Sequence, residues 1–199
     1  MSSAVRIALF ATIALISVGV GLWFGSRPSG PEATNPYGHI GGAFTLESAA
    51  GPVSLKDFEG KVVAIYFGYT HCPDICPTSL ASLAAAIAEL TPAEQAQVQG
   101  VFISVDPERD NPQRASEYAK AFHPGFAGLT GSEEAIAEVA KRYFVLYEKV
   151  QMEDSAMGYA VDHSSIVYVL DRDGKVRTLV RHSQSPAEMT KALRDALRT

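Results

Sequence analysis

The sequence predicts an α/β sandwich with a mixed central sheet, preceded by a single N-terminal transmembrane helix. Segments with strand and helix patterns alternate along the chain, and a β-hairpin and a helix close it. This order is typical of a layered α/β domain. The chain has 199 residues, of which 47% are hydrophobic and 20% charged. That length and composition suit one globular domain with an appendage.

The appendage begins with an apolar run. Residues 7–24 are uncharged and almost wholly apolar, with Arg6 before them and Trp23 near their end. A helix of this length spans most of a hydrocarbon core of about 30 Å, and the tryptophan lies where an interfacial aromatic is expected. A cleaved signal peptide is the alternative, but the bulky residues 22–24 occupy the place where small residues precede a cleavage site. We therefore expect an uncleaved membrane anchor.

These patterns divide the chain into a membrane anchor at 1–24, a flexible linker rich in Ser, Pro and Gly at 25–39, and a folded domain at 40–199. The basic start of the chain favours a cytoplasmic N-terminus. We therefore expect a single-pass protein of the bacterial inner membrane with its C-terminal domain in the periplasm. The mitochondrial inner membrane, facing the intermembrane space, is the alternative. The absence of an Arg- and Ser-rich amphipathic leader favours the bacterium.

The first half of the domain contains a buried strand followed by a helix. A hairpin is expected around residues 49–51. Residues 62–67 form a short, continuous apolar run rich in β-branched and aromatic side chains, which is typical of a central parallel strand. Pro77 has no amide hydrogen and suits the first residue of a helix. We therefore predict a helix over residues 77–90 with Cys76 as its N-cap.

The second half continues the alternation. Asn111 and Ser132 are N-cap residues that open the next two helices, and Ser185 opens the terminal helix with a capping box and a proline. The polar residues 151–158 are interpreted as a mobile loop. Further strands are predicted at residues 101–105, 126–129, 144–150, 166–170 and 175–180.

The two cysteines of the chain lie close together. Cys72 and Cys76 follow the buried strand directly, so both thiols belong to one site. A helix N-terminus carries unpaired amides and a positive dipole end, which favour a thiolate at Cys76. The functional crevice of an open α/β sheet lies off the carboxyl ends of its strands, where we expect the cysteine loop to meet residues 106–110. Residues 161–165 reach the same edge if the next strand is antiparallel or if a loop folds back.

Three segments carry a family resemblance: Tyr-Phe-Gly-Tyr-Thr-His-Cys-Pro-Asp-Ile-Cys-Pro, Ser-Val-Asp-Pro-Glu-Arg-Asp-Asn-Pro and Val-Asp-His-Ser-Ser-Ile-Val-Tyr-Val. The cysteine spacing, the flanking prolines and the distant histidine agree as a set. The chain resembles the SCO/SenC family, which comprises membrane-anchored, thioredoxin-fold copper proteins of cytochrome c oxidase assembly. The similarity extends from about Ile40 to the end of the chain.

The resemblance implies a thioredoxin-like domain that holds a copper ion, Cu(I) or Cu(II), through Cys72, Cys76 and His163. The two cysteines would also form a redox disulfide. The chemistry of this set agrees, because thiolates favour Cu(I) and an imidazole also suits Cu(II). Three ligands leave an open coordination position, and no fourth ligand that would close a structural zinc site is evident. A structural disulfide or a plain redox dithiol is the alternative for the cysteines.

Asp162 and Asp106 are candidates for orienting the ligands or for forming a docking rim, since a metal-bound imidazole usually donates its other N–H to an oxygen. Solvated loop carboxylates are the alternative. If Cys72 faces the metal, the side chain of its neighbour His71 points away from the metal in an extended segment. His71 therefore stays outside the expected ligand set.

These features predict a membrane-anchored copper metallochaperone that delivers copper to the CuA site of cytochrome c oxidase subunit II, with a copper donor protein as a second partner. A thiol–disulfide reductase that prepares the CuA cysteines, or a copper or redox sensor, is the alternative. The three-residue spacer between the cysteines argues against a general reductase, so no enzyme activity is expected apart from thiol–disulfide exchange. The formal charge is −5 and no basic patch is evident, so no nucleic-acid partner is expected.

Overall fold

The computed structural model of the chain describes residues 35–152 and 157–199. The described residues from Pro36 onward belong to one compact unit. The expected anchor at 1–24, and the linker up to residue 34, lie outside the described residues. Within the described part of the chain, no helix is both long enough and apolar enough to span a bilayer.

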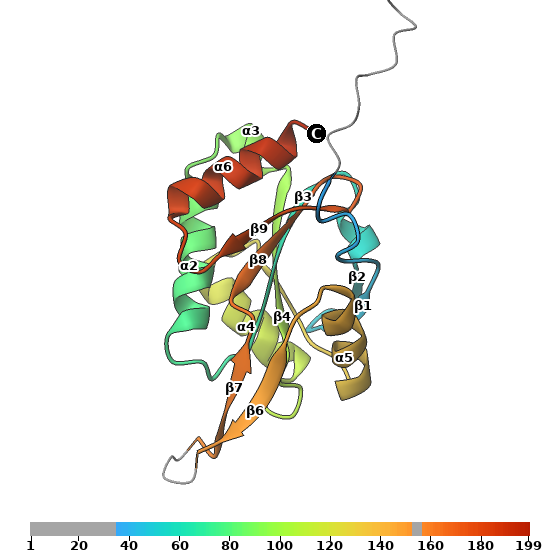
Figure 1. Cartoon of the computed structure of the whole chain (residues 1–199), viewed down its shortest axis with the longest axis vertical. Coiled ribbons are helices and arrows are strands. Elements are labelled where there is room, and N and C mark those ends of the chain that lie inside the picture. Colours follow the sequence, from blue (N-terminus) through green and yellow to red (C-terminus); the bar gives the residue numbers. More distant parts are fainter. Residues whose placement is uncertain (1–34, 153–156) are drawn as a thin grey trace, which may run out of the picture. The chain divides into compact units, whose positions relative to one another are not determined.

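The central sheet has five strands in the order β5, β4, β3, β8 and β9 (Figure 1). β3, β4 and β5 run parallel, whereas β8 is antiparallel to β3, and β9 to β8. The predicted mixed sheet is therefore confirmed. The bounds of these strands are Val62–Gly68 for β3, Val98–Ser104 for β4, Ala127–Leu129 for β5, Ile166–Leu170 for β8 and Val176–Arg181 for β9.

Helices cover both faces of this sheet. α2 and α4 connect β3 to β4 and β4 to β5, and right-handed parallel crossovers that progress in one direction place both helices on one face. α6 packs against α2 on that face, and α5 lies on the other side with a small hairpin, β1–β2 (Figure 1). The bounds are Ile75–Ala88 for α2, Pro92–Gln95 for α3, Pro112–Phe122 for α4, Glu133–Arg142 for α5, Pro186–Leu197 for α6, Leu55–Phe58 for the 3-10 turn η1, Thr45–Ser48 for β1 and Gly51–Ser54 for β2.

β3 lies at the centre of the core, and all seven of its residues are buried. Successive side chains of a strand point to opposite faces. Phe67 packs against the Tyr143 ring at 5.5 Å between centroids, on the α5 side. Tyr66 and Gly68 face the opposite side, towards α2. A strand buried on both faces fixes the position of whatever follows its carboxyl end, which here is the cysteine loop.

α2 begins earlier than the sequence predicted. The helix starts at Ile75 with Asp74 as its N-cap, so the prediction that Cys76 is the N-cap is wrong. The first four amides of a helix have no partner inside it, so a proline is tolerated throughout the first turn and does not fix the first residue. Cys76 is therefore a helical residue, and its side chain is fully buried.

The chain also forms a hairpin that the sequence pattern did not reveal. β6 spans Tyr147–Gln151 and β7 spans Tyr159–His163, and the two pair antiparallel in a sheet of their own. The predicted loop at 151–158 is therefore wrong at its first residue, and β7 was missed. Its five residues are too few to show a clear alternation, and cross-strand pairing with β6 decides their conformation. Phe144 has a φ of 54°, which delays the start of β6 relative to the prediction.

The other three predicted helix caps, Asn111, Ser132 and Ser185, are confirmed. The Asn111 side chain accepts the Arg114 N–H at 2.8 Å, and the Ser185 hydroxyl accepts the Glu188 N–H at 3.3 Å. Each such bond satisfies an amide that the helix itself leaves unpaired. These local signals place α4 and α6 correctly because a cap acts within one turn of chain.

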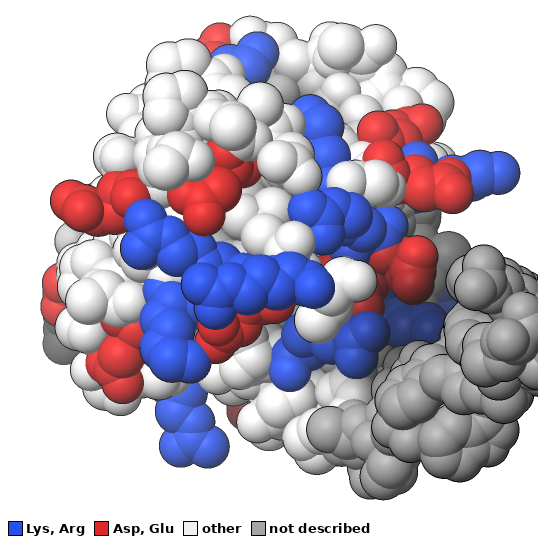
Figure 2. Space-filling model, turned by 90° about the horizontal axis from the view of Figure 1, so that it is seen from above, with Lys and Arg blue, Asp and Glu red and all other residues white. Residues whose placement is uncertain are grey.

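The end of the domain around α6 carries basic and acidic side chains side by side (Figure 2). Lys191 pairs with Asp195 at 2.6 Å, and Arg194 with Glu94 at 3.5 Å. Exposed pairs of this kind contribute about 0–1 kcal/mol each. This end is therefore a solvated surface of mixed charge.

A substitution at Gly128 tests the packing of β5 on α4. A Cβ at Gly128 would lie 2.0 Å from the Ala115 carbonyl oxygen, which is backbone and cannot move aside. Gly128→Ala is expected to lower the free energy of unfolding by about 2 kcal/mol or more, measured by urea denaturation. Gly125→Ala, whose Cβ would meet the flexible His123 side chain at 3.3 Å, is the control. Equal stability of the two variants would contradict the packing.

Candidate metal centre

Two sulfur atoms and one imidazole nitrogen come together at the carboxyl end of β3. The ligand atoms of Cys72, Cys76 and His163 all lie within 4.8 Å of one another. The Cys76 sulfur is 3.2 Å from His163 Nε2, although the two residues are 87 positions apart in the sequence. Cys76 is fully buried, whereas Cys72 and His163 are half-buried. The group is thus closed on the Cys76 side and reachable from the other.

Gly68 makes room for the Cys76 thiol. A Cβ at this last residue of β3 would lie 2.7 Å from the Cys76 sulfur. The absence of a side chain therefore lets the first turn of α2 approach the strand. The backbone N–H of Cys76 in turn donates to the Cys72 sulfur at 3.4 Å. Both thiols are consequently fixed by backbone, one against a strand and the other against a helix N-terminus.

His163 is the last residue of β7 and comes from the opposite end of the sequence. The next strand, β8, is antiparallel to β3. This meets one of the two conditions under which residues 161–165 reach the cysteines. The His163 ring lies edge-on to the rings of Tyr66 and Tyr69, each at 5.9 Å between centroids. Its Nδ1 lies 3.3 Å from the Ser164 carbonyl oxygen, which leaves Nε2 directed at the sulfurs.

The two thiols share a proton unequally. The Cys76 thiol donates a hydrogen bond to the Cys72 sulfur, and this bond is the main reason why the pKa of Cys72 lies well below its ordinary value. The same bond, together with burial, raises the pKa of Cys76. These directions oppose the sequence-based expectation of a thiolate at Cys76 and favour a thiolate at Cys72 instead. Both cysteines are free thiols in this structure.

The two candidate aspartates differ in their surroundings. Asp162 is exposed and lines a hollow of about 350 Å³ together with Cys72 and His163. The Nδ1 of His163 lies 3.3 Å from the Ser164 carbonyl oxygen, and a role of Asp162 in orienting the imidazole stays a prediction. Its place on a docking rim stays a prediction. Asp106 is fully buried and bonds to Arg109 and Tyr159, which does not suit a docking rim, and its role in orienting the ligands stays a prediction.

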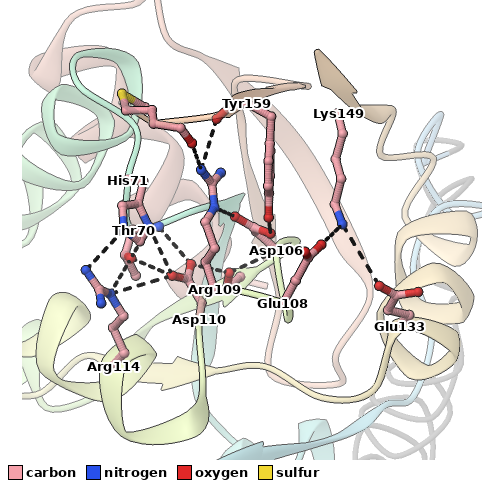
Figure 3. A network of polar contacts seen from close by, with 12 residues as sticks. Thr70, His71, Asp106, Glu108, Arg109, Asp110, Arg114, Glu133, Lys149 and Tyr159 are labelled. Atoms are coloured by element: carbon pink, nitrogen blue, oxygen red, sulfur yellow. Dashed lines mark hydrogen bonds and ion pairs between the residues drawn. The ribbon is translucent and has the colours of Figure 1, made fainter. Parts of the chain in front are cut away.

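Residues around the site that sequence reasoning missed belong to one polar network (Figure 3). Arg109 and Tyr159 connect to Asp106, and Thr70 connects to Asp110. Their signal in the sequence is weak, because an arginine between two aspartates in a loop is usually a solvated charge. His71 contacts Arg114 at 3.3 Å and lies outside the group formed by Cys72, Cys76 and His163.

The fold and the site together define a thioredoxin-like domain with a thiol–imidazole centre for a soft metal. The family model described as SCO1/SenC matches residues 32–198. The chain belongs to the SCO1/SenC family, which confirms the resemblance seen in the sequence.

Relatives of known name support this assignment. The SCO2-like protein of Rickettsia conorii is 41% identical over 157 residues, which cover 78% of this chain and 76% of that protein. The mitochondrial SCO1 homolog 1 of Arabidopsis thaliana is 51% identical over 132 residues, which cover 66% of this chain but 39% of the relative. The chain therefore matches well under half of that longer protein.

Solved structures agree with the fold. The copper-bound ScoI of Arabidopsis thaliana has a TM-score of 0.74 and 43% identity, and the match covers 80% of this chain and 98% of that one. Copper-bound yeast Sco1 has a TM-score of 0.72 and 31% identity, with 80% and 89% covered. A BsSco structure, whose study describes a disulfide switch in a cytochrome c oxidase assembly protein, has a TM-score of 0.63 and 27% identity, with 83% and 98% covered.

The unequal thiols predict unequal alkylation. Because the pKa of Cys72 is lowered, its thiolate is already formed near neutral pH. The rate of its modification by iodoacetamide should therefore stay nearly constant between about pH 6 and pH 8, whereas an ordinary thiol reacts about tenfold faster per pH unit in that range. Mass spectrometry of the reduced, metal-free chain should find the first adduct on Cys72.

The denatured chain is the control for this experiment, since both cysteines should then react alike and with the ordinary pH dependence. A first adduct on Cys76 in the folded chain would contradict the assignment of the thiolate.

Proposed function

We propose that this chain is a copper metallochaperone that binds Cu(I) or Cu(II) through Cys72, Cys76 and His163 and delivers it to the CuA site of cytochrome c oxidase subunit II. The observation that carries the proposal is the convergence of the three ligand atoms within 4.8 Å of one another. Two solved relatives of the same fold have copper bound, and another belongs to a family of cytochrome c oxidase assembly proteins.

The ligand set suits a metal that must be held and then released. Two thiolates bind Cu(I) well, and the imidazole adds a ligand that Cu(II) accepts. Three protein ligands leave a coordination position open for a ligand of the receiving protein. Cys76 is fully buried, and the half-buried Cys72 and His163 line the open hollow. The copper would therefore leave by the side of the hollow, where a partner can reach it.

A second candidate function is thiol–disulfide exchange that prepares the cysteines of the CuA site. The lowered pKa of Cys72 favours it, because exchange requires a thiolate beside a second thiol. The raised pKa of Cys76 opposes rapid exchange, since the resolving thiol must lose its proton before it attacks the Cys72 sulfur of the mixed disulfide. A redox disulfide between Cys72 and Cys76 belongs to this second proposal.

The location and remaining partners are part of the same proposal. We infer a single-pass anchor at residues 1–24 and a domain on the periplasmic side of a bacterial inner membrane, where a donor protein supplies the copper. Named relatives include a bacterial protein from Rickettsia and mitochondrial proteins from Arabidopsis and Bos taurus. The mitochondrial inner membrane is therefore the alternative location.

Removal of the imidazole tests the ligand set. His163→Ala should lose Cu(II) affinity by about tenfold or more and change the Cu(II) absorption spectrum, because the only nitrogen ligand of the set is gone. Cu(I) binding should survive through the two thiolates. Equilibrium titration with a competing chelator measures both affinities.

His123→Ala, which removes a histidine from the end of α4, is the matched control and should bind both ions like the unaltered chain. Unchanged Cu(II) affinity and spectrum in His163→Ala would remove His163 from the site.

Delivery needs a separate measurement. The copper-loaded full chain, mixed with the metal-free CuA domain of subunit II, should give the absorption bands of an assembled CuA centre. The same mixture with the cysteines of the CuA domain oxidised distinguishes the two functions. Assembly only with reduced cysteines supports copper delivery alone, whereas assembly after reduction of the disulfide by this chain supports the exchange reaction.

A further inference from the structure

One loop beside the metal centre holds two buried carboxylates. Residues 106–110 connect β4 to α4, and the side chains of Asp106 and Asp110 are both fully buried. Figure 3 shows this loop between the segment that carries Thr70 and His71 and the hairpin that carries Tyr159 and Lys149. The loop therefore contacts both of the segments that carry the ligands of the metal centre, one through Thr70 and the other through Tyr159.

Arg109 joins the loop to the hairpin strand β7. Its Nε donates to Asp106 at 2.5 Å, and one of its terminal nitrogens donates to the backbone carbonyl oxygens of Tyr159 at 2.9 Å and Met157 at 3.2 Å. The guanidinium also stacks on the Tyr159 ring at 3.6 Å from its centroid. The Tyr159 hydroxyl closes the ring of contacts by donating to Asp106 at 2.7 Å.

Asp110 joins the same loop to the segment that carries Cys72. Its carboxylate accepts the Thr70 N–H at 2.8 Å and the Thr70 hydroxyl at 2.5 Å. It also accepts the Ser104 hydroxyl at 2.6 Å, so the loop is tied to the end of β4 as well. Thr70 stands two residues before Cys72. The position of the Cys72 loop relative to β4 is thus fixed by a buried charge with three donors.

The hairpin needs such an attachment. β6 and β7 form a two-stranded sheet separate from the central sheet, and an isolated two-stranded hairpin is marginally stable in water. His163 is the last residue of β7, four positions after Tyr159. A second link between hairpin and loop, the ion pair of Lys149 with Glu108, is exposed and contributes little. Arg109 is only 16% exposed and donates to two backbone carbonyls of the hairpin segment.

We propose that the loop Asp106–Asp110 is a positioning element that holds the imidazole of His163 at binding distance from the two thiols before any metal arrives, and that Arg109 is the residue that fixes the imidazole side. This inference rests on the proposed function, because it assigns Arg109 a role in copper binding. Arg109 touches neither thiol nor imidazole and acts through the hairpin.

The proposal predicts different effects on the binding of Cu(I) and of Cu(II). Cu(I) is satisfied by the two thiolates, whereas Cu(II) needs the nitrogen ligand. A hairpin released from Arg109 would leave the cysteines in place and displace the imidazole. Loss of the contacts between Arg109 and the hairpin should therefore weaken Cu(II) binding much more than Cu(I) binding. A residue that only stabilised the fold would affect both ions alike.

The chain offers a matched control for Arg109. Arg177 of β9 also donates from Nε to a buried aspartate, Asp171, at 2.5 Å, but it lies on the strand that is farthest from β4 in the sheet order. Arg109→Lys and Arg177→Lys therefore remove the same planar fork from the same kind of pair. Tyr159→Phe is a milder test, since it removes only the hydroxyl that bonds to Asp106.

The test measures Cu(II) and Cu(I) dissociation constants of the full chain, with reduced cysteines, and hydrogen exchange of the β7 amides in the metal-free state. Arg109→Lys is expected to weaken Cu(II) binding about 10- to 100-fold, to change Cu(I) binding less than about threefold, and to speed exchange in β7. Tyr159→Phe should change the same quantities in the same direction by less. Arg177→Lys should change neither the ratio of Cu(II) to Cu(I) affinity nor the hydrogen exchange of the β7 amides.

Two results would overturn the proposal. One is an unchanged ratio of Cu(II) to Cu(I) affinity in Arg109→Lys, and the other is an equal loss of both ions in Arg109→Lys and Arg177→Lys. If the unaltered chain bound no copper, the proposed function would fail, and the exchange of β7 amides would still decide whether Arg109 holds the hairpin.

Discussion

The contact between the Cys76 sulfur and the His163 imidazole is the interaction on which the rest of the site depends. It joins two segments 87 positions apart at 3.2 Å, and three features of the fold make it possible. Gly68 leaves space for the thiol beside β3. The antiparallel β8 begins beside the carboxyl end of β3, so His163, the last residue of the preceding strand β7, lies at that end. The β6–β7 hairpin then carries the imidazole across to α2.

The site is asymmetric in both charge and access. Cys76 is buried and its raised pKa favours the protonated thiol, whereas the lowered pKa of Cys72, at the hollow, favours a thiolate. A metal ion would displace that one remaining proton on binding both sulfurs, and burial of Cys76 would slow attack by solvent or oxidants at that sulfur. This division suits a carrier that protects one ligand and presents the other side of its cargo to a partner.

Much of the fold could be predicted from the sequence, and the errors have identifiable causes. Local signals succeeded where one turn of chain decides the outcome, as at the caps Asn111 and Ser185. The prediction of β3 succeeded because a strand covered on both faces is apolar throughout. The start of α2 was misplaced because every position of the first helical turn tolerates a proline. β7 was missed because its stability comes from pairing, which a single sequence does not display.

The same distinction applies to the site. The spacing of the cysteines and the distant histidine form a pattern that sequence alone can find, but the partners of Asp106 cannot be found that way. Its carboxylate is buried against Arg109 and Tyr159, and only the fold brings Tyr159 to the loop. X-ray absorption spectroscopy of the Cu(II)-loaded full chain tests the account most directly. It should show two sulfur scatterers and the multiple-scattering signature of one imidazole around the copper, and a spectrum with no imidazole, or with a single sulfur, would contradict it.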